Sequence, residues 1–272
     1  LIVRESRHGP VVSDVLRRPP GMNDLIPEPY VLALSAALFA PEDKSGEGVY
    51  YMNHAKDAAG FIDAIRRFHA PHQNMMFADR TGAMGYYAPG RVPLRKAGNG
   101  MVPVPGWDGS HDWTGWVPFE ELPRVSDPAA EVIINANNKM VGNSYAHLLA
   151  AQWPDSFRAM RIADVLSTEK VVTVDATAAL QLDIVSVMAR EMLPLLVSKA
   201  TAASPRGREL LERLKSWDGT TDAGRLEPLM FAVWIERVKM KILADDLGDM
   251  MRSFGGVRPE LIRTILTTDE AW

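Results

Sequence analysis

Residues 98–123 read GNGMVPVPGWDGSHDWTGWVPFEELP, and no other stretch says as much about the fold. Prolines and glycines recur along it, so the segment is extended and braced by turns. It carries four large aromatic side chains, Trp107, Trp113, Trp116 and Phe119. Because large aromatic residues first of all contribute packing area, we interpret it as a surface loop whose rings fasten it to the core.

Short apolar runs separated by turns precede this stretch. Residues 31–34 and Met75–Ala78 have the length of strands. A polar turn at residues 79–82 separates the second run from Met84–Tyr87, and this pattern predicts a β-hairpin. One helix is predicted over residues 56–68, where the apolar side chains fall on a single face.

After residue 150 the pattern becomes helical. In a long amphipathic helix predicted over residues 173–193, Asp175 can cap the start and Pro194 can end or kink the helix. Its predicted buried stripe includes Leu180, Ile184, Val187 and Met188. Further helices are predicted over residues 156–165, 208–217, 228–247 and 259–266.

Strands followed by helices predict an α+β fold rather than alternating βαβ units. We expect two domains. Residues 1–150 would form a partial sheet region with one helix, and residues 151–272 a mainly helical region packed against it. The chain starts at Leu1 with an apparent strand over residues 1–4, and residues 269–272 look like the opening of another helix. We therefore interpret the chain as an internal piece of a longer protein.

Composition excludes several classes of function. The net charge of −4 gives no general attraction to nucleic acid or to an anionic membrane, and the basic pair Arg17–Arg18 is too short to change that. The absence of cysteine excludes disulfides and a cysteine nucleophile. No apolar run reaches the roughly 18 residues that a membrane-spanning helix needs.

Generic catalytic motifs are absent: there is no glycine-rich phosphate loop, no G-x-S-x-G and no H-E-x-x-H. His69 and His72 lie close together in the sequence, with Pro71 between them. We interpret them as loop residues rather than as metal ligands.

A series of short landmarks closely resembles the penicillin acylase family, whose members are N-terminal-nucleophile hydrolases. The run at residues 98–123 is the most similar, and residues 136–138 match the family's "ANN" tripeptide. The other landmarks occur in the same order along nearly the whole chain. They are residues 7–10 (RHGP), Gln73-Asn74, residues 77–79, Gly82, residues 85–91, Trp153 with Arg158 and Arg161, and residues 217–219 (WDG).

The resemblance implies an α+β fold that is part of an αββα sandwich, here from the β-subunit region of the family's precursor. It also implies a mechanism in which an N-terminal serine, freed by self-cleavage, attacks a linear amide with its own α-amine as the base. That serine lies outside this chain. An asparagine side chain helps to hold the oxyanion, and its match is Asn137. From the residues alone, Asn137 and Asn138 could equally form an Asx turn.

The resemblance also implies an arginine in the polar network of the site. Its match is Arg158, and the alternatives are a surface charge at the helix start or the neighbouring Arg161. The reaction needs no cofactor. Family members often bind calcium through a proline backbone carbonyl, and Pro93 matches that proline. His147 stands near the position where some members have a carboxylate ligand, and histidine is a poor calcium ligand. We therefore do not expect calcium binding by this chain alone.

Two functions remain open: a segment of an amidohydrolase, or a non-catalytic binding or structural module of the same fold. The family acts on β-lactam side chains, acyl-homoserine lactones and lipopeptides, and the residues do not choose among them. The implied partners are the small amide substrate and the other α- and β-subunit segments of the precursor. The implied location is periplasmic or secreted. We expect the isolated chain to be inactive and to self-associate through apolar surface that missing strands would cover.

Overall fold

The structure is a computed structural model that describes residues 2–13, 15, 29–129, 131–168, 171–252 and 258–268. Leu1, the pair Arg17–Arg18 and residues 269–272 lie outside the described residues, and residues 2–4 of the expected first strand form no strand. Contacts between Cα atoms divide the chain into two compact units, Leu1–Pro154 and Asp155–Trp272. The expected packing of residues 151–272 against residues 1–150 stays a prediction.

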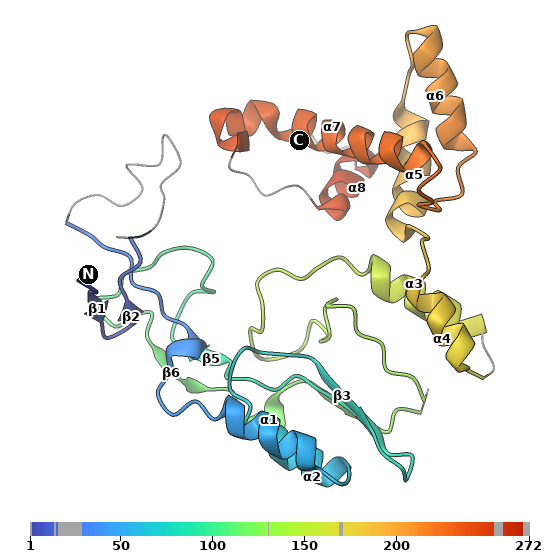
Figure 1. The fold of residues 1–272 in the computed structure, drawn as a ribbon. Helices are drawn as coiled ribbons and strands as arrows, with labels where there is room; N and C mark the ends of the chain where they lie inside the picture. The colour runs from blue at the N-terminus through green and yellow to red at the C-terminus, as the bar shows by residue number, and fades with distance from the viewer. Residues whose placement is uncertain are drawn as a thin grey trace. The chain divides into compact units, whose positions relative to one another are not determined.

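The described residues of unit 1 form three small antiparallel sheets (Figure 1). The predicted hairpin is confirmed, because Met75 pairs with Tyr87 and Ala78 with Met84. Asp79 closes its turn by accepting from the Thr81 amide at 2.8 Å. The strands are β1 (Glu5–Ser6), β2 (Gly9–Pro10), β3 (Met75–Ala78), β4 (Met84–Tyr87), β5 (Pro93–Arg95), β6 (Trp113–Trp116) and β7 (Arg124–Ser126), with β4 between β3 and β7.

Two helices, rather than the one predicted over residues 56–68, precede the hairpin. They are α1 (Ser45–His54) and α2 (Ala58–Ile65), which lie side by side. The first turn of α1 contains two glycines, which are weak helix formers. Gly48 is buried, and a Cβ there would lie 3.0 Å from the Phe68 amide nitrogen, so the glycine permits close packing. Asp57 caps α2 by accepting from the Gly60 amide at 2.8 Å.

The aromatic stretch contains β6 and a short 3-10 helix, η2 (Phe119–Glu121); another, η1 (Ala37–Phe39), lies earlier. Trp113 and Trp116 are partly buried in edge contact, as expected of packing residues. Trp107 differs: it is 70% exposed and stacks on Tyr30. Residues 132–135, which precede the "ANN" tripeptide, form no strand, and residues 136–138 are bends.

Unit 2 is helical in its described residues. The long helix predicted over residues 173–193 is wrong, because the backbone turns away at residues 182–186. There Val185 bridges to Thr220, and the Ser186 amide donates to the Gly219 carbonyl. The helices are α3 (Phe157–Thr168), α4 (Val174–Gln181), α5 (Val187–Lys199), α6 (Pro205–Lys215), α7 (Glu227–Leu247), η3 (Gly248–Arg252) and α8 (Pro259–Thr267).

A hydroxyl side chain caps the N-terminus of each of the two helices, α4 and α5, that replace the predicted long helix. Thr173, and not Asp175, caps α4 by accepting from the Ala176 amide, and Ser186 caps α5 through the Ala189 amide. Pro194 lies inside α5 rather than at its end. Of the predicted stripe, Val187 is buried, whereas Ile184 is exposed because it lies in the break.

One apolar core holds unit 2 together. Its buried members come from α5, α6, α7 and α8 and from the turn after α6 (Figure 1). They are Ala189, Met192, Leu193, Leu196, Leu214, Trp217, Phe231, Ile235, Leu243 and Ile262. With β1 to β7 in the first unit and α3 to α8 in the second, the α+β fold class is confirmed.

Candidate functional site

The residue matched to the oxyanion donor lies in an unusual turn. Asn137 has φ +65°, in the left-handed region that side chains other than glycine seldom occupy. Its amide donates to the Asn135 side-chain oxygen at 3.0 Å, and the Ala136 amide donates to the Asn138 side-chain oxygen at 3.1 Å. The turn is therefore built from its own asparagines, with Asn137 on the exposed side.

Residues from the hairpin continue this hydrogen-bonded set. Asn74, directly before β3, donates to the Asn135 side-chain oxygen at 3.1 Å. The buried Tyr86 of β4 donates to the Asn74 side-chain oxygen at 2.6 Å. Burial raises the pKa of the Tyr86 hydroxyl, so the hydroxyl keeps its proton over the ordinary pH range. The turn of Asn137 is thus connected to a paired strand.

The chain after Asn137 is fastened at several points. Met140 contacts the Tyr86 hydroxyl through its sulfur. The Tyr145 hydroxyl donates to the Glu121 carbonyl at 2.8 Å, and His147 lies 2.6 Å from the Glu121 carboxylate. Leu149 packs against a small apolar cluster of Val92, Val117 and Leu122. An open hollow of about 480 Å³ lies along this segment, lined by residues 122–124, 140–142 and 144–146.

Arg158 lies exposed in the first turn of α3. Its neighbour Arg161 makes a two-pronged ion pair with Asp183, with distances of 3.0 and 2.6 Å. This pair lowers the pKa of Asp183 and raises that of Arg161. Arg161 therefore holds α3 to the break between α4 and α5. Asn137 belongs to unit 1 and Arg158 to unit 2, so their association stays a prediction.

The residues expected around calcium do not make a calcium site by themselves. Pro93 begins β5 opposite Trp116, and His147 is engaged with Glu121. Calcium prefers several oxygen ligands, and an imidazole nitrogen supplies none. In the described ranges, no three carboxylate or imidazole side chains gather at a point suited to a metal. The donor set does not fit calcium, and the role of Pro93 stays a prediction.

His69 and His72 each have a structural setting. His69 accepts from the Lys44 amide at 3.1 Å and lies 3.7 Å from an Asp43 oxygen. His72 packs against Gly90, where an added Cβ would lie 2.8 Å from the His72 Cα. Burial lowers the pKa of His72, which favours the neutral ring. Both histidines are explained as loop residues.

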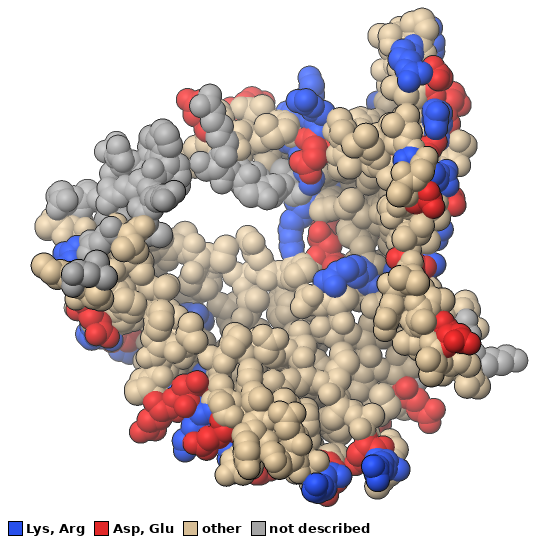
Figure 2. Space-filling model, in the orientation of Figure 1, with Lys and Arg blue, Asp and Glu red and all other residues tan. Residues whose placement is uncertain are grey.

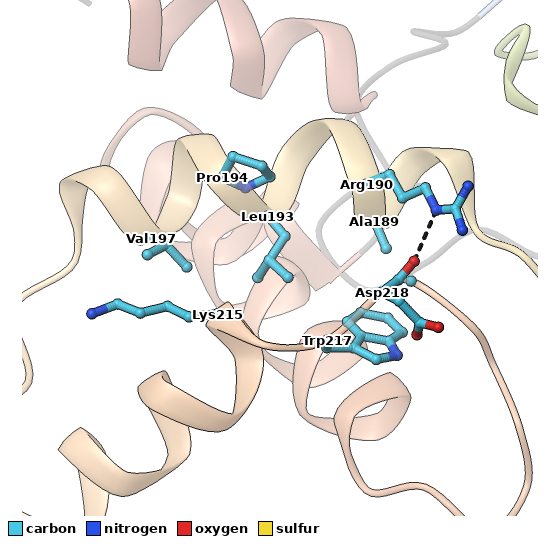
Figure 3. Close-up of a pocket in the computed structure, with 9 residues that line it drawn as sticks. Ala189, Arg190, Leu193, Pro194, Val197, Lys215, Trp217 and Asp218 are labelled. Carbon is cyan, nitrogen blue, oxygen red and sulfur yellow. Dashed lines mark hydrogen bonds between the residues drawn. The ribbon is translucent and has the colours of Figure 1, made fainter.

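A second hollow, of about 260 Å³, lies in unit 2 beside the "WDG" landmark (Figure 3). Leu193, Val197 and Trp217 form its apolar wall, and Arg190 crosses one end by donating to the Asp218 carbonyl at 2.8 Å. Gly219, at φ +83°, leaves room for the Arg190 side chain. The residues that line this hollow include no serine, threonine or histidine, so we read the landmark as a packing element.

The face seen in Figure 2 carries no broad patch of charge of one sign. Basic and acidic side chains lie interspersed there, and along α6 they form the neighbouring pairs Arg206–Glu209 and Lys215–Glu212. No helix among the described residues combines the length and apolar character needed to cross a bilayer.

Comparison with known proteins decides the family. The family model for penicillin amidase matches residues 1–272. The chain belongs to the penicillin amidase family. It is 34% identical, over 81% of its length, to penicillin acylase 2 proenzyme of Pseudomonas sp. strain SE83. It is 28% identical, over 91% of its length, to acyl-homoserine lactone acylase QuiP of Pseudomonas aeruginosa.

The chain spans only part of these family members, 27% of the proenzyme and 31% of QuiP. Its structure resembles thermostable penicillin G acylase from Alcaligenes faecalis with a TM-score of 0.71, at 20% identity. That likeness covers 92% of this chain and 45% of the other, and it confirms the fold expected from the resemblance.

The sequence alone did not assign Asn74, Tyr86 and Asn135 to the candidate site. Asn74 and Tyr86 were noted as landmarks of the hairpin, and Asn135 stands two residues before Asn137. A polar residue at a strand end and a tyrosine on the neighbouring strand were the available signals. Their connection depends on the register Met76↔Tyr86, which the sequence does not specify.

Proposed function

We propose that the protein carrying this chain is an amidohydrolase of the penicillin acylase type. It cleaves a linear amide bond with an N-terminal serine that lies outside this chain. Asn137 supplies one hydrogen-bond donor to the oxyanion of the tetrahedral intermediate. The serine attacks the amide carbon, its α-amine takes the hydroxyl proton, and the amine leaving group receives that proton as the C–N bond breaks.

The geometry of the Asn137 turn carries the proposal. Asparagine adopts the left-handed region more readily than most residues other than glycine, and contacts with its neighbours can hold it at φ +65°. Asn135 makes such a contact here, and the Asn137 side chain is exposed. An oxyanion donor needs such a fixed orientation, because a donor that reorganises during the reaction stabilises the transition state less.

Arg158 is proposed as part of the polar network near the nucleophile. A cation in the first turn of α3 opposes the helix dipole, so helix stability does not explain an arginine there. Arg161, one turn later, is accounted for by its pair with Asp183. Arg158 is also the arginine that the family resemblance matches to this role.

A non-catalytic module of the same fold is the alternative. It would keep the family fold without an N-terminal serine. Mass spectrometry of the mature full-length protein separates the two: a subunit that begins with serine upstream of Leu1 supports the enzyme, and an uncleaved chain without such a residue supports the module.

Substrate, partners and location follow from the family and are also proposals. The matched proteins are named for penicillins and acyl-homoserine lactones, so an acylated amine is the proposed substrate class. The other subunit segments of the precursor are the proposed partners. Exposed apolar residues, among them Leu229 and Val233 of α7, offer surface for them. A periplasmic or secreted location is proposed.

Asn137→Ala in the full-length protein tests the oxyanion role. We expect kcat to fall about a hundredfold or more, with a small change in KM, because loss of one oxyanion donor costs about 3 kcal/mol. Chromogenic phenylacetyl amides and an acyl-homoserine lactone would be the assayed substrates.

Two control variants separate the amide from the backbone. Asn137→Gly keeps the left-handed conformation without strain and should lose as much activity as Asn137→Ala. Asn99→Ala removes an exposed turn asparagine, which accepts from the Met101 amide, and should leave kcat unchanged. A kcat within about threefold of wild type for Asn137→Ala would remove Asn137 from the mechanism.

A further inference from the structure

The hydrogen bonds behind Asn137 have a fixed direction. A backbone amide can only donate, so the Asn135 atom that accepts from the Asn137 amide must be its side-chain oxygen. The same oxygen lies 3.1 Å from the Asn74 side chain, which must therefore present its nitrogen. The Asn74 oxygen is then left for the Tyr86 hydroxyl, 2.6 Å away.

The three side chains differ in how deeply they are buried. Tyr86 is 5% exposed and lies on β4, which is paired on both sides, by β3 and by β7. Asn74 and Asn135 are partly buried, and Asn137 is exposed. The set therefore runs from a paired strand to an exposed turn, and the side-chain amides of Asn74 and Asn135 can make these bonds in one orientation only.

From this arrangement we infer that Asn74, Asn135 and Tyr86 are positioning residues that set the orientation of Asn137. The inference rests on the proposed function, because it assigns these residues an effect on the oxyanion donor. Asn135 holds the Asn137 backbone in its left-handed conformation, Asn74 holds the Asn135 side chain, and Tyr86 holds Asn74. None of the three touches the reacting atoms.

Asn74→Asp is the sharpest variant for the test. It keeps the side-chain shape and can still accept from Tyr86, but it presents an oxygen to the Asn135 oxygen and so breaks one bond. In the full-length protein we expect kcat to fall about tenfold, as for the loss of one hydrogen bond in the set, with KM within about twofold. Tyr86→Phe, which keeps the ring, should lower kcat by about threefold.

A double-mutant cycle separates positioning from simple stabilisation. If Asn74 acts through Asn137, then Asn74→Asp in an Asn137→Ala background lowers kcat no further. The same tenfold loss in that background overturns the inference, as does wild-type kcat in both Asn74→Asp and Tyr86→Phe. Should Asn74→Asp fail to fold, Tyr86→Phe is carried through the same cycle with the same two outcomes. Loss of the proposed function looks different: there Asn137→Ala itself leaves kcat unchanged.

Discussion

The two units are stabilised in different ways. In unit 2, ten buried apolar residues from α5 to α8 make one continuous cluster. In the described part of unit 1, Val92, Val117 and Leu122 form a small buried cluster. Side chains of Asp and Asn there close turns and cap a helix. Apolar packing thus holds the helical unit. Local hydrogen bonds define the backbone in the unit that carries Asn137, where fixed polar groups matter for the proposed chemistry.

The largest expected effect comes from opening the core of unit 2. Ile262 is fully buried in it. We expect Ile262→Ala in the full-length protein to lower the local free energy of unfolding by about 2 to 5 kcal/mol. Hydrogen exchange followed by mass spectrometry should show faster exchange in α5, α7 and α8 together.

Lys241→Ala is the matched control, because Lys241 is an exposed residue of α7 and its replacement should change stability by less than about 0.5 kcal/mol. Faster exchange confined to α8 in Ile262→Ala would show that the core is not one cooperative unit.

A smaller and more local effect is expected in unit 1. Leu122→Ala removes a buried residue from the three-membered cluster and should cost about 2 to 3 kcal/mol. Faster exchange should be limited to β5, β6 and the segment around Leu149, measured beside Leu148→Ala, an exposed neighbour. If exchange also rises in α1 and α2, unit 1 is as cooperative as unit 2 and the comparison fails.

The smallest effect concerns the acid stability of the hairpin turn. Hydrogen bonds from Thr81, first from its hydroxyl and then from its amide, lower the pKa of Asp79. The folded pKa lies below the unfolded one, so the contribution of Asp79 is complete above about pH 4 and is lost as pH falls through the folded value. Asp79→Asn should therefore destabilise the protein at pH 6 and less so at pH 3. Urea titrations at both pH values test this, and an equal difference at both would contradict it.

The sequence predicted structure best where local patterns act alone. The hairpin at Met75–Tyr87 and the helices near α3, α6, α7 and α8 were found from alternation and helical spacing. The predictions were wrong where contacts with segments far away in the sequence determine the local backbone. The long helix breaks because residues 184–186 bond to the turn at Gly219–Thr221, and α1 forms because Gly48 allows contact with the chain beyond α2.

The candidate site was predictable in identity but not in construction. Resemblance to the family pointed to Asn137. The Asx turn that the structure shows is made by the side chain of Asn135, which accepts from the Asn137 amide. The support from Asn74 and Tyr86 was hidden, because it depends on strand register and on side-chain direction 61 residues along the chain.

Side-chain contacts hold the chain in place on both sides of residues 141–144, which makes this stretch suitable for loop engineering. Upstream, Tyr86 holds Asn74 and contacts Met140; downstream, Tyr145 and His147 attach to Glu121. Between these points the chain lines the open hollow through Val141, Gly142 and Ser144. Insertions or deletions confined to residues 141–144 would leave both attachments in place. This short stretch is therefore where a library of loop lengths could reshape the hollow while Asn137 keeps its conformation.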